Sequence, residues 1–188
     1  YIDTEKRIWF GFDNGDIALY EDLQYRLFKP EPDNISAIKG FTEDKNGNIL
    51  VATQSKGIIR ITPEGALSYL SGGIEDQFIT AINITDTGDL LIGTFNGLYL
   101  YNYSPDSEFL QMAIHFENIP LTNILEIYRK SETSDFWIGV ADEGLYKLSF
   151  EKEGGVNIVN TGSEFGISDY DIQSIHEKDN GNLWLATE

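Results

Sequence analysis

The sequence predicts an all-β protein built from repeated antiparallel sheets of four strands, and two observations lead to that prediction. A polar turn followed by a short apolar strand recurs five times along the 188 residues. A small residue closes each of these apolar strands, at Gly11, Ala52, Gly93, Gly139 and Ala186. The steps between them are 41, 41, 46 and 47 residues, and a period in the forties made of strands and turns is typical of a β-propeller.

The first repeat is partial and covers residues 1–33. It is expected to hold a strand at 7–12, a returning strand at 17–20 and an outer strand at 25–28. Pro30 and Pro32 end the outer strand, because proline cannot donate to the hydrogen bonds of a sheet. This segment therefore supplies the last three strands of a four-stranded unit.

Three full repeats follow, and their expected bounds are 34–76, 77–120 and 121–167. In the first of them, the Asn46-Gly47 pair is the strongest short signal for a hairpin turn. Its strands are expected at 34–41, 49–53, 57–61 and 67–70. Those of the second are expected at 79–84, 90–94, 97–101 and 109–115. A further partial repeat at 168–188 is expected to hold a first and a second strand.

The second strands are apolar without interruption, as at residues 49–51 and 90–92. A strand of this kind is covered on both faces, and in a propeller the two neighbouring blades supply the two covers. Trp9, Trp137 and Trp184 stand at one place in these strands, so we expect all three in the core.

The number of strands bears on whether the ring is closed. A closed ring of four blades needs one further first strand to complete the N-terminal unit, and it would leave the strand at 183–187 surplus. We therefore expect an open arc of four to four and a half blades, cut from a ring of roughly six to eight. The four-blade ring is the alternative.

The composition excludes several classes of partner. Lys and Arg total 13 against 31 Asp and Glu, for a formal net charge of -18. Such a surface repels nucleic acid phosphates and anionic lipids. The chain has no cysteine, which excludes disulfides and thiolate chemistry. No apolar run reaches the roughly 18 residues that a membrane span needs, so we expect no direct membrane insertion by this segment.

Residues with catalytic or metal-binding chemistry are sparse. The two histidines, His115 and His176, have no metal-ligand spacing, and the nucleophile elbow of serine hydrolases is missing from the sequence. The acidic residues cluster where turns are expected, and aspartate commonly serves in turns. We therefore expect no catalytic residue, no metal site and no cofactor.

The turn and strand pattern resembles the two-component regulator propeller repeat, over essentially the whole chain. The residues that carry the resemblance in the last copy are Asp179, Gly181, Asn182, Leu183, Trp184, Ala186 and Thr187. In the third copy they are Asp86, Gly88, Leu90, Ile92, Gly93, Thr94, Gly97, Leu98, Tyr99 and Tyr101. In the fourth they are Trp137, Ile138, Gly139, Gly144, Leu145 and Tyr146.

The resemblance implies a periplasmic or extracellular sensor propeller of a bacterial inner membrane protein, of the hybrid two-component or histidine kinase kind. Many sensors of this family respond to oligosaccharides, so it also implies an oligosaccharide ligand. Neighbouring propeller or signalling domains, or a second copy of the chain, are the expected protein partners. Two other functions stay open: a scaffold propeller that binds only protein, and a polysaccharide lyase or glycosidase of the propeller kind.

A ligand is expected on one face of the ring, where the loops between second and third strands emerge with those between fourth and first strands. These loops carry amides, acids and aromatics, the mixture that recognition of a sugar needs. The candidate ligand-binding residues are Asn14, Lys56, Phe95, Asn96, Asp142, Glu143, Asp169 and Tyr170. A face that only packs against another domain is the competing interpretation.

Overall fold

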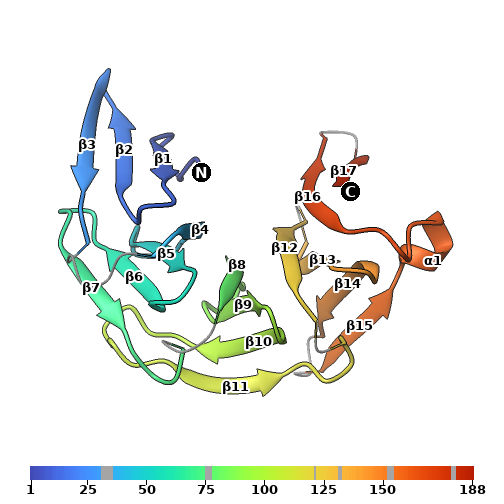
Figure 1. Ribbon diagram of the computed structural model, residues 1–188. Coiled ribbons are helices and arrows are strands. Elements are labelled where there is room, and N and C mark those ends of the chain that lie inside the picture. Colours follow the sequence, from blue (N-terminus) through green and yellow to red (C-terminus); the bar gives the residue numbers. More distant parts are fainter. Residues whose placement is uncertain (31–35, 75–77, 121, 131–132, 152–154, 179–180) are drawn as a thin grey trace.

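A computed structural model describes residues 1–188 except 31–35, 75–77, 121, 131–132, 152–154 and 179–180. The described residues form 17 strands and one short helix, arranged in five antiparallel sheets. The sheets stand side by side around an open arc, and the two chain ends face each other across its gap (Figure 1). We number the sheets as blades 1 to 5 in chain order. The β-propeller class predicted from the sequence is confirmed.

The strands follow one another from the inside of the arc outward within each complete blade. Blade 1 holds β1 (Ile8–Gly11), β2 (Ile17–Glu21) and β3 (Gln24–Phe28). Blade 2 holds β4 (Ile38–Glu43), β5 (Ile49–Thr53), β6 (Ile58–Ile61) and β7 (Leu67–Leu70). Blade 3 holds β8 (Ile79–Ile84), β9 (Leu90–Thr94), β10 (Gly97–Asn102) and β11 (Gln111–His115).

The last two blades are joined by the helix. Blade 4 holds β12 (Ile124–Arg129), β13 (Asp135–Val140), β14 (Gly144–Phe150) and β15 (Val156–Asn160). Helix α1 (Gly162–Phe165) follows, and blade 5 holds β16 (Ile172–Glu177) and β17 (Leu183–Thr187). The repeat boundaries predicted at 33/34 and 76/77, and the motif residues Pro32 and Asp179, lie outside the described residues.

One apolar cluster fills each interface between successive blades, and the second strands contribute to two clusters at once. In β5, Leu50 and Ala52 belong to the cluster with blade 3, whereas Ile49 and Val51 belong to the cluster with blade 1. Successive side chains of a strand point to opposite faces, so an uninterrupted apolar run is what a strand between two neighbours requires.

The small residue that closes each second strand allows the next blade to come close. A Cβ atom built on Gly139 would lie 2.4 Å from the carbonyl oxygen of Ile172, the first residue of β16. A Cβ atom on Gly93 would lie 2.6 Å from Cγ2 of Ile124, the first residue of β12. The period read from the sequence therefore marks the point where the inner strand of each blade touches the blade before it.

The prediction for the three tryptophans is confirmed at two positions and wrong at the third. Trp9 and Trp137 are 3% and 9% exposed, but Trp184 is 60% exposed. Trp9 belongs to the cluster between blades 1 and 2, and Trp137 to that between blades 4 and 5, so this position faces the following blade. No described residue lies beyond blade 5 to cover Trp184, and only the Lys178 ammonium lies over its ring, at 4.3 Å.

The N-terminal residues hold more of the first repeat than the three strands predicted for it. The Trp9 N–H donates to the Tyr1 carbonyl at 2.8 Å, and the Tyr1 ammonium donates to the Trp9 carbonyl at 3.0 Å. A bridge between Ile2 and Ile8 continues this antiparallel pairing. Tyr1 and Ile2 therefore occupy the position of the first strand in blade 1. In a closed ring of four blades, a C-terminal strand would have to take that same position.

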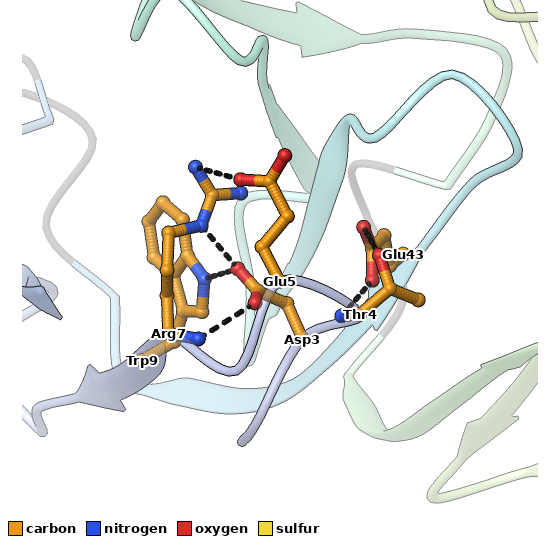
Figure 2. A network of polar contacts seen from close by, with 6 residues as sticks. All are labelled: Asp3, Thr4, Glu5, Arg7, Trp9 and Glu43. Carbon is orange, nitrogen blue, oxygen red and sulfur yellow. Dashed lines mark hydrogen bonds and ion pairs between the residues drawn. The ribbon is translucent and has the colours of Figure 1, made fainter.

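The turn that follows this short pairing is held by a buried carboxylate (Figure 2). Asp3 accepts hydrogen bonds from the Arg7 backbone N–H at 2.9 Å, from Arg7 Nε at 2.7 Å and from Trp9 Nε1 at 2.8 Å. Asp44 accepts from the Asn48 backbone N–H in the same way, at 3.0 Å. The first turn of blade 1 is thus built like that of blade 2, and it is tied to a core tryptophan.

Candidate functional site

The loops that carry the predicted ligand-binding residues are joined in pairs within three of the blades. In blade 2 the Gln54 N–H donates to the Ala37 carbonyl at 2.8 Å, and in blade 4 the Ala141 N–H donates to the Asn123 carbonyl at 2.9 Å. The Phe95 N–H donates to the Phe78 carbonyl at 3.1 Å in blade 3. Each bond links the loop after the second strand to the loop before the first strand, so these loops share one face of the arc, which we call the loop face.

The predicted residues are accessible, but they are spread over the five blades. All of them are exposed except Glu143, which is half-buried. Asn14 and Lys56 lie in blades 1 and 2, and Phe95 and Asn96 lie together in blade 3. The remaining four lie in blade 4 and in the segment that leads to blade 5: Asp142, Glu143, Asp169 and Tyr170.

The loops of blades 4 and 5 come together around Asp142. Its backbone has a φ of 61°, and its N–H donates to Oδ1 of Asp171 at 2.7 Å. The neighbouring Glu143 accepts a long hydrogen bond of 3.4 Å from the Tyr146 hydroxyl. The loop after β13 and the segment before β16 therefore meet through a hydrogen bond from a backbone N–H to a side-chain carboxylate. Among the described residues, no three His, Cys, Asp or Glu side chains are grouped to hold a metal ion.

An aromatic pair on the loop face was not recognised in the sequence. The rings of Phe78 and Phe95 stack with centroids 5.6 Å apart and planes at 8°. They remain 50% and 44% exposed. The sequence gives one sign of this pair. Phe78 directly precedes the inner strand β8, whereas the residues that precede β4 and β12 are Ala37 and Asn123. Large exposed aromatic surfaces commonly mark binding sites.

A second candidate site is a cavity of about 1100 Å³ on the inside of the arc, along β4, β8 and β12. Each inner strand has a β-bulge at the same place, directly after its first residue. The residues at the bulges all line the cavity: Lys39, Thr80, Leu125 and Gln173. A bulge redirects a side chain, and no pattern in the sequence distinguished these four residues.

The charges on this inner wall are mixed. Lys39, Glu43 and Glu126 line it, together with the ion pair between Arg129 and Asp86. Burial raises the pKa of Glu126, although a backbone hydrogen bond at Ile127 opposes the shift. The wall therefore offers separate cationic, anionic and neutral groups, and it has a stacked aromatic pair of its own, Tyr1 and Phe41, whose ring centroids lie 6.2 Å apart.

Among the described residues, no helix has the length and apolar character that crossing a membrane would take.

Comparison with known proteins identifies the repeat. Residues 166–188 match the family model described as two component regulator propeller. A search of the curated proteins found no match.

Solved structures share the fold at low sequence identity. The extracellular domain of a B. thetaiotaomicron protein described as a hybrid two component system is 24% identical, with a TM-score of 0.76 over 99% of this chain and 25% of that chain. Another B. thetaiotaomicron extracellular domain, described as a one component system, is 16% identical, with a TM-score of 0.71 over 100% of this chain and 28% of that one. Virginiamycin B lyase from Staphylococcus aureus is 14% identical, with a TM-score of 0.75 over 99% of this chain and 61% of the lyase.

The chain thus spans about a quarter of the length of the two extracellular domains that it matches. At these identities the likeness establishes the fold, which the two extracellular domains share with the lyase. Together with the matched family model, it makes residues 166–188 a two component regulator propeller repeat, at the end of a chain with the β-propeller fold.

Proposed function

We propose that the chain is a non-catalytic part of the extracytoplasmic sensor propeller of a bacterial two-component signalling protein, and that its loop face recognises a neutral oligosaccharide. The family repeat at residues 166–188 and the shared fold of the extracellular domains support the signalling role. The observation that carries the ligand proposal is the exposed pair of Phe78 and Phe95.

The chemistry of the loop face suits a sugar. The apolar faces of sugar rings stack on aromatic side chains, and their hydroxyl groups need donors and acceptors nearby. Asn96 directly follows Phe95 and is exposed, so an amide stands beside the aromatic pair. A formal net charge of -18 disfavours sulfated or uronic acid sugars, which is why we propose a neutral ligand.

The placement of the two histidines supports a catalytic role less than it supports a binding role. The His115 ring is stacked on Tyr99 with centroids 4.6 Å apart and planes at 13°. His176 is exposed on β16, in the inner part of blade 5. His176 lies toward the far end of its strand from the loop face. His115 ends β11 next to that face, but its ring is taken up by the stack on Tyr99, whose hydroxyl donates to the Asn96 carbonyl at 3.2 Å.

Calorimetry with neutral oligosaccharides tests the proposal. We expect Phe95→Ala to weaken binding by roughly threefold to tenfold, because it removes one ring of the stacked pair. The matched control is Phe109→Ala, since Phe109 is 64% exposed and lies in the loop between β10 and β11, on the opposite face. Affinity should be unchanged in that variant.

Three outcomes would contradict the proposal. Failure of every oligosaccharide to bind would leave the protein-binding scaffold as the better account. Equal losses in Phe95→Ala and Phe109→Ala would remove the loop face as the site. Turnover of a bound oligosaccharide, measured as new reducing ends, would make the chain part of an enzyme.

A further inference from the structure

Glu126 is a charged residue at a position where the other described inner strands have a small residue. In blades 2 to 5, the second residue after the start of the inner strand lies opposite the small residue that closes the second strand. It is Gly40 in β4, Ala81 in β8 and Ser174 in β16, but Glu126 in β12. Departures from a shared local pattern are expected at functional positions.

The Glu126 side chain lines the inner cavity next to blade 3. It is half-buried on β12, which faces the inside of the arc together with β8 (Figure 1). On one side of it, the Thr80 hydroxyl of β8 donates to the Ile124 carbonyl. On the other side, Asn83 Nδ2 donates to the Ile127 carbonyl at 3.1 Å. These bonds fix the wall around Glu126, and blades 3 and 4 each have a neighbouring blade on both sides.

The Glu126 carboxylate has no ion-pair partner among the described residues. Arg129 lies on the same strand, but it pairs with Asp86. Lys39 lies on β4, with β8 between it and β12 (Figure 1). The cations of the inner wall therefore leave this carboxylate to a ligand.

Burial gives the carboxylate a reason to bind a cation. Burial raises the pKa of the Glu126 carboxyl, and a backbone hydrogen bond at Ile127 opposes that shift only in part. A carboxylate that loses water without gaining an ion partner costs free energy, and a bound cation would offset that cost. The formal net charge of -18 also raises the concentration of cations near the protein.

The surroundings favour an organic ammonium over a metal ion. Ca²⁺ and Mg²⁺ take several oxygen ligands, and the described part of the chain has no group of three His, Cys, Asp or Glu that could hold a metal ion. An ammonium can donate to a single carboxylate and to neutral acceptors. Thr80 and Asn83 line the same cavity of about 1100 Å³ and add a hydroxyl and an amide.

We propose that Glu126 and the adjoining wall of β8 form a binding site for a small primary amine whose other groups are neutral and polar, such as an amino sugar or an amino alcohol. The ammonium donates to the Glu126 carboxylate, and the neutral groups bond to Thr80 and Asn83. This site lies on the inside of the arc and is independent of sugar binding on the loop face.

Calorimetry with glucosamine at neutral pH tests the proposal, because glucose and N-acetylglucosamine have the same ring without the positive charge. We expect saturable binding of glucosamine to the 188-residue chain. The two neutral sugars should bind at least about tenfold more weakly, because they cannot form the charged hydrogen bond. No binding of glucosamine, or binding no stronger than that of glucose, would overturn the proposal.

Variants of the chain locate the site. Glu126→Gln keeps the shape of the side chain, removes its charge and should weaken glucosamine binding at least about tenfold. The matched control is Glu43→Gln. Glu43 lines the same cavity, but its carboxylate already accepts hydrogen bonds from the Thr4 N–H and hydroxyl, both at 2.7 Å. That variant should bind glucosamine normally, and so should Phe95→Ala on the loop face.

The variants also separate a local site from attraction by the overall charge. Equal losses in Glu126→Gln and Glu43→Gln would show that net charge alone draws the amine, and they would overturn the proposal. A loss in Phe95→Ala with normal binding in Glu126→Gln would place the amine on the loop face and would overturn it as well. Circular dichroism checks that each variant remains folded.

Discussion

A Gly139→Val substitution is expected to lower the free energy of unfolding by about 3 kcal/mol. A Cβ atom at this position would lie 2.4 Å from the Ile172 carbonyl oxygen and 3.0 Å from the Ile172 Cβ. The oxygen belongs to the backbone of β16 and cannot rotate away as a side chain could. Valine therefore forces blade 5 away from blade 4 and opens the cluster that contains Trp137 and Ile172.

The matched control for this variant is Ala186→Val. Ala186 occupies the same place in blade 5, but it is exposed, because no described blade covers it. Valine there should change the stability by less than about 0.5 kcal/mol. Urea unfolding followed by tryptophan fluorescence measures both variants. If Gly139→Val loses no more stability than Ala186→Val, the small residue at this position does not serve to let the blades come close together.

Replacing Asp3 with alanine is expected to cost about 3 kcal/mol of stability. Its carboxylate side chain is fully buried and accepts three hydrogen bonds, one from the Trp9 indole and two from Arg7. Removing it leaves the Trp9 N–H and the mostly buried Arg7 guanidinium without their acceptor. The matched control is Glu5→Ala, because Glu5 pairs with the same arginine but is largely exposed and should contribute less than about 1 kcal/mol.

The stability provided by Asp3 should depend on pH in one direction. Burial would raise the pKa of the carboxyl, but the hydrogen bonds from Trp9 and Arg7 outweigh burial and hold that pKa below its usual value. A carboxyl group whose pKa is lower in the folded state stabilises the protein at pH values above its unfolded pKa of about 3.9. That stabilisation is lost as the pH falls through the folded pKa. The difference in stability between wild type and Asp3→Ala should therefore be constant from neutral pH to about 5 and shrink in more acid solution. A difference that grows on acidification would contradict this account.

The parts of the fold that were predicted correctly are those fixed by contacts that every repeat makes. Gly93 and Gly139 mark the same close approach to the next inner strand, so their spacing gave the period. Val51 and Ala52 face opposite neighbours, so the uninterrupted apolar run identified a covered strand. Such signals are local and repeat along the chain, and for that reason one sequence suffices to read them.

The first turn was missed because one residue departs from the usual type. Lys6 has a φ of 66° at the place where Gly47 has a φ of 77°. Glycine is the residue that favours this conformation, and a lysine there gave no sign of a turn. The exposure of Trp184 was missed for another reason: it depends on whether a further blade covers the strand, and the strand's own sequence does not contain that information.

The candidate site was harder to predict than the fold. The position of Phe95 after a second strand placed it on the loop face, but its contact with Phe78 depends on how the loop before β8 folds back. The bulge residues on the inner wall, such as Lys39 and Thr80, were missed because a bulge changes the direction of a side chain and not the hydrophobic pattern.

Hydrogen exchange, measured strand by strand on the unmodified chain, tests most directly whether each blade is shielded by its neighbours. The amides of β5 and β9, which are fully buried between two blades, should exchange most slowly. Those of β17, with one face and one edge exposed, should exchange at least about tenfold faster, because local opening requires less buried surface to be exposed. Protection of β17 equal to that of β9, or rapid exchange throughout β5 and β9, would contradict the stacked arc.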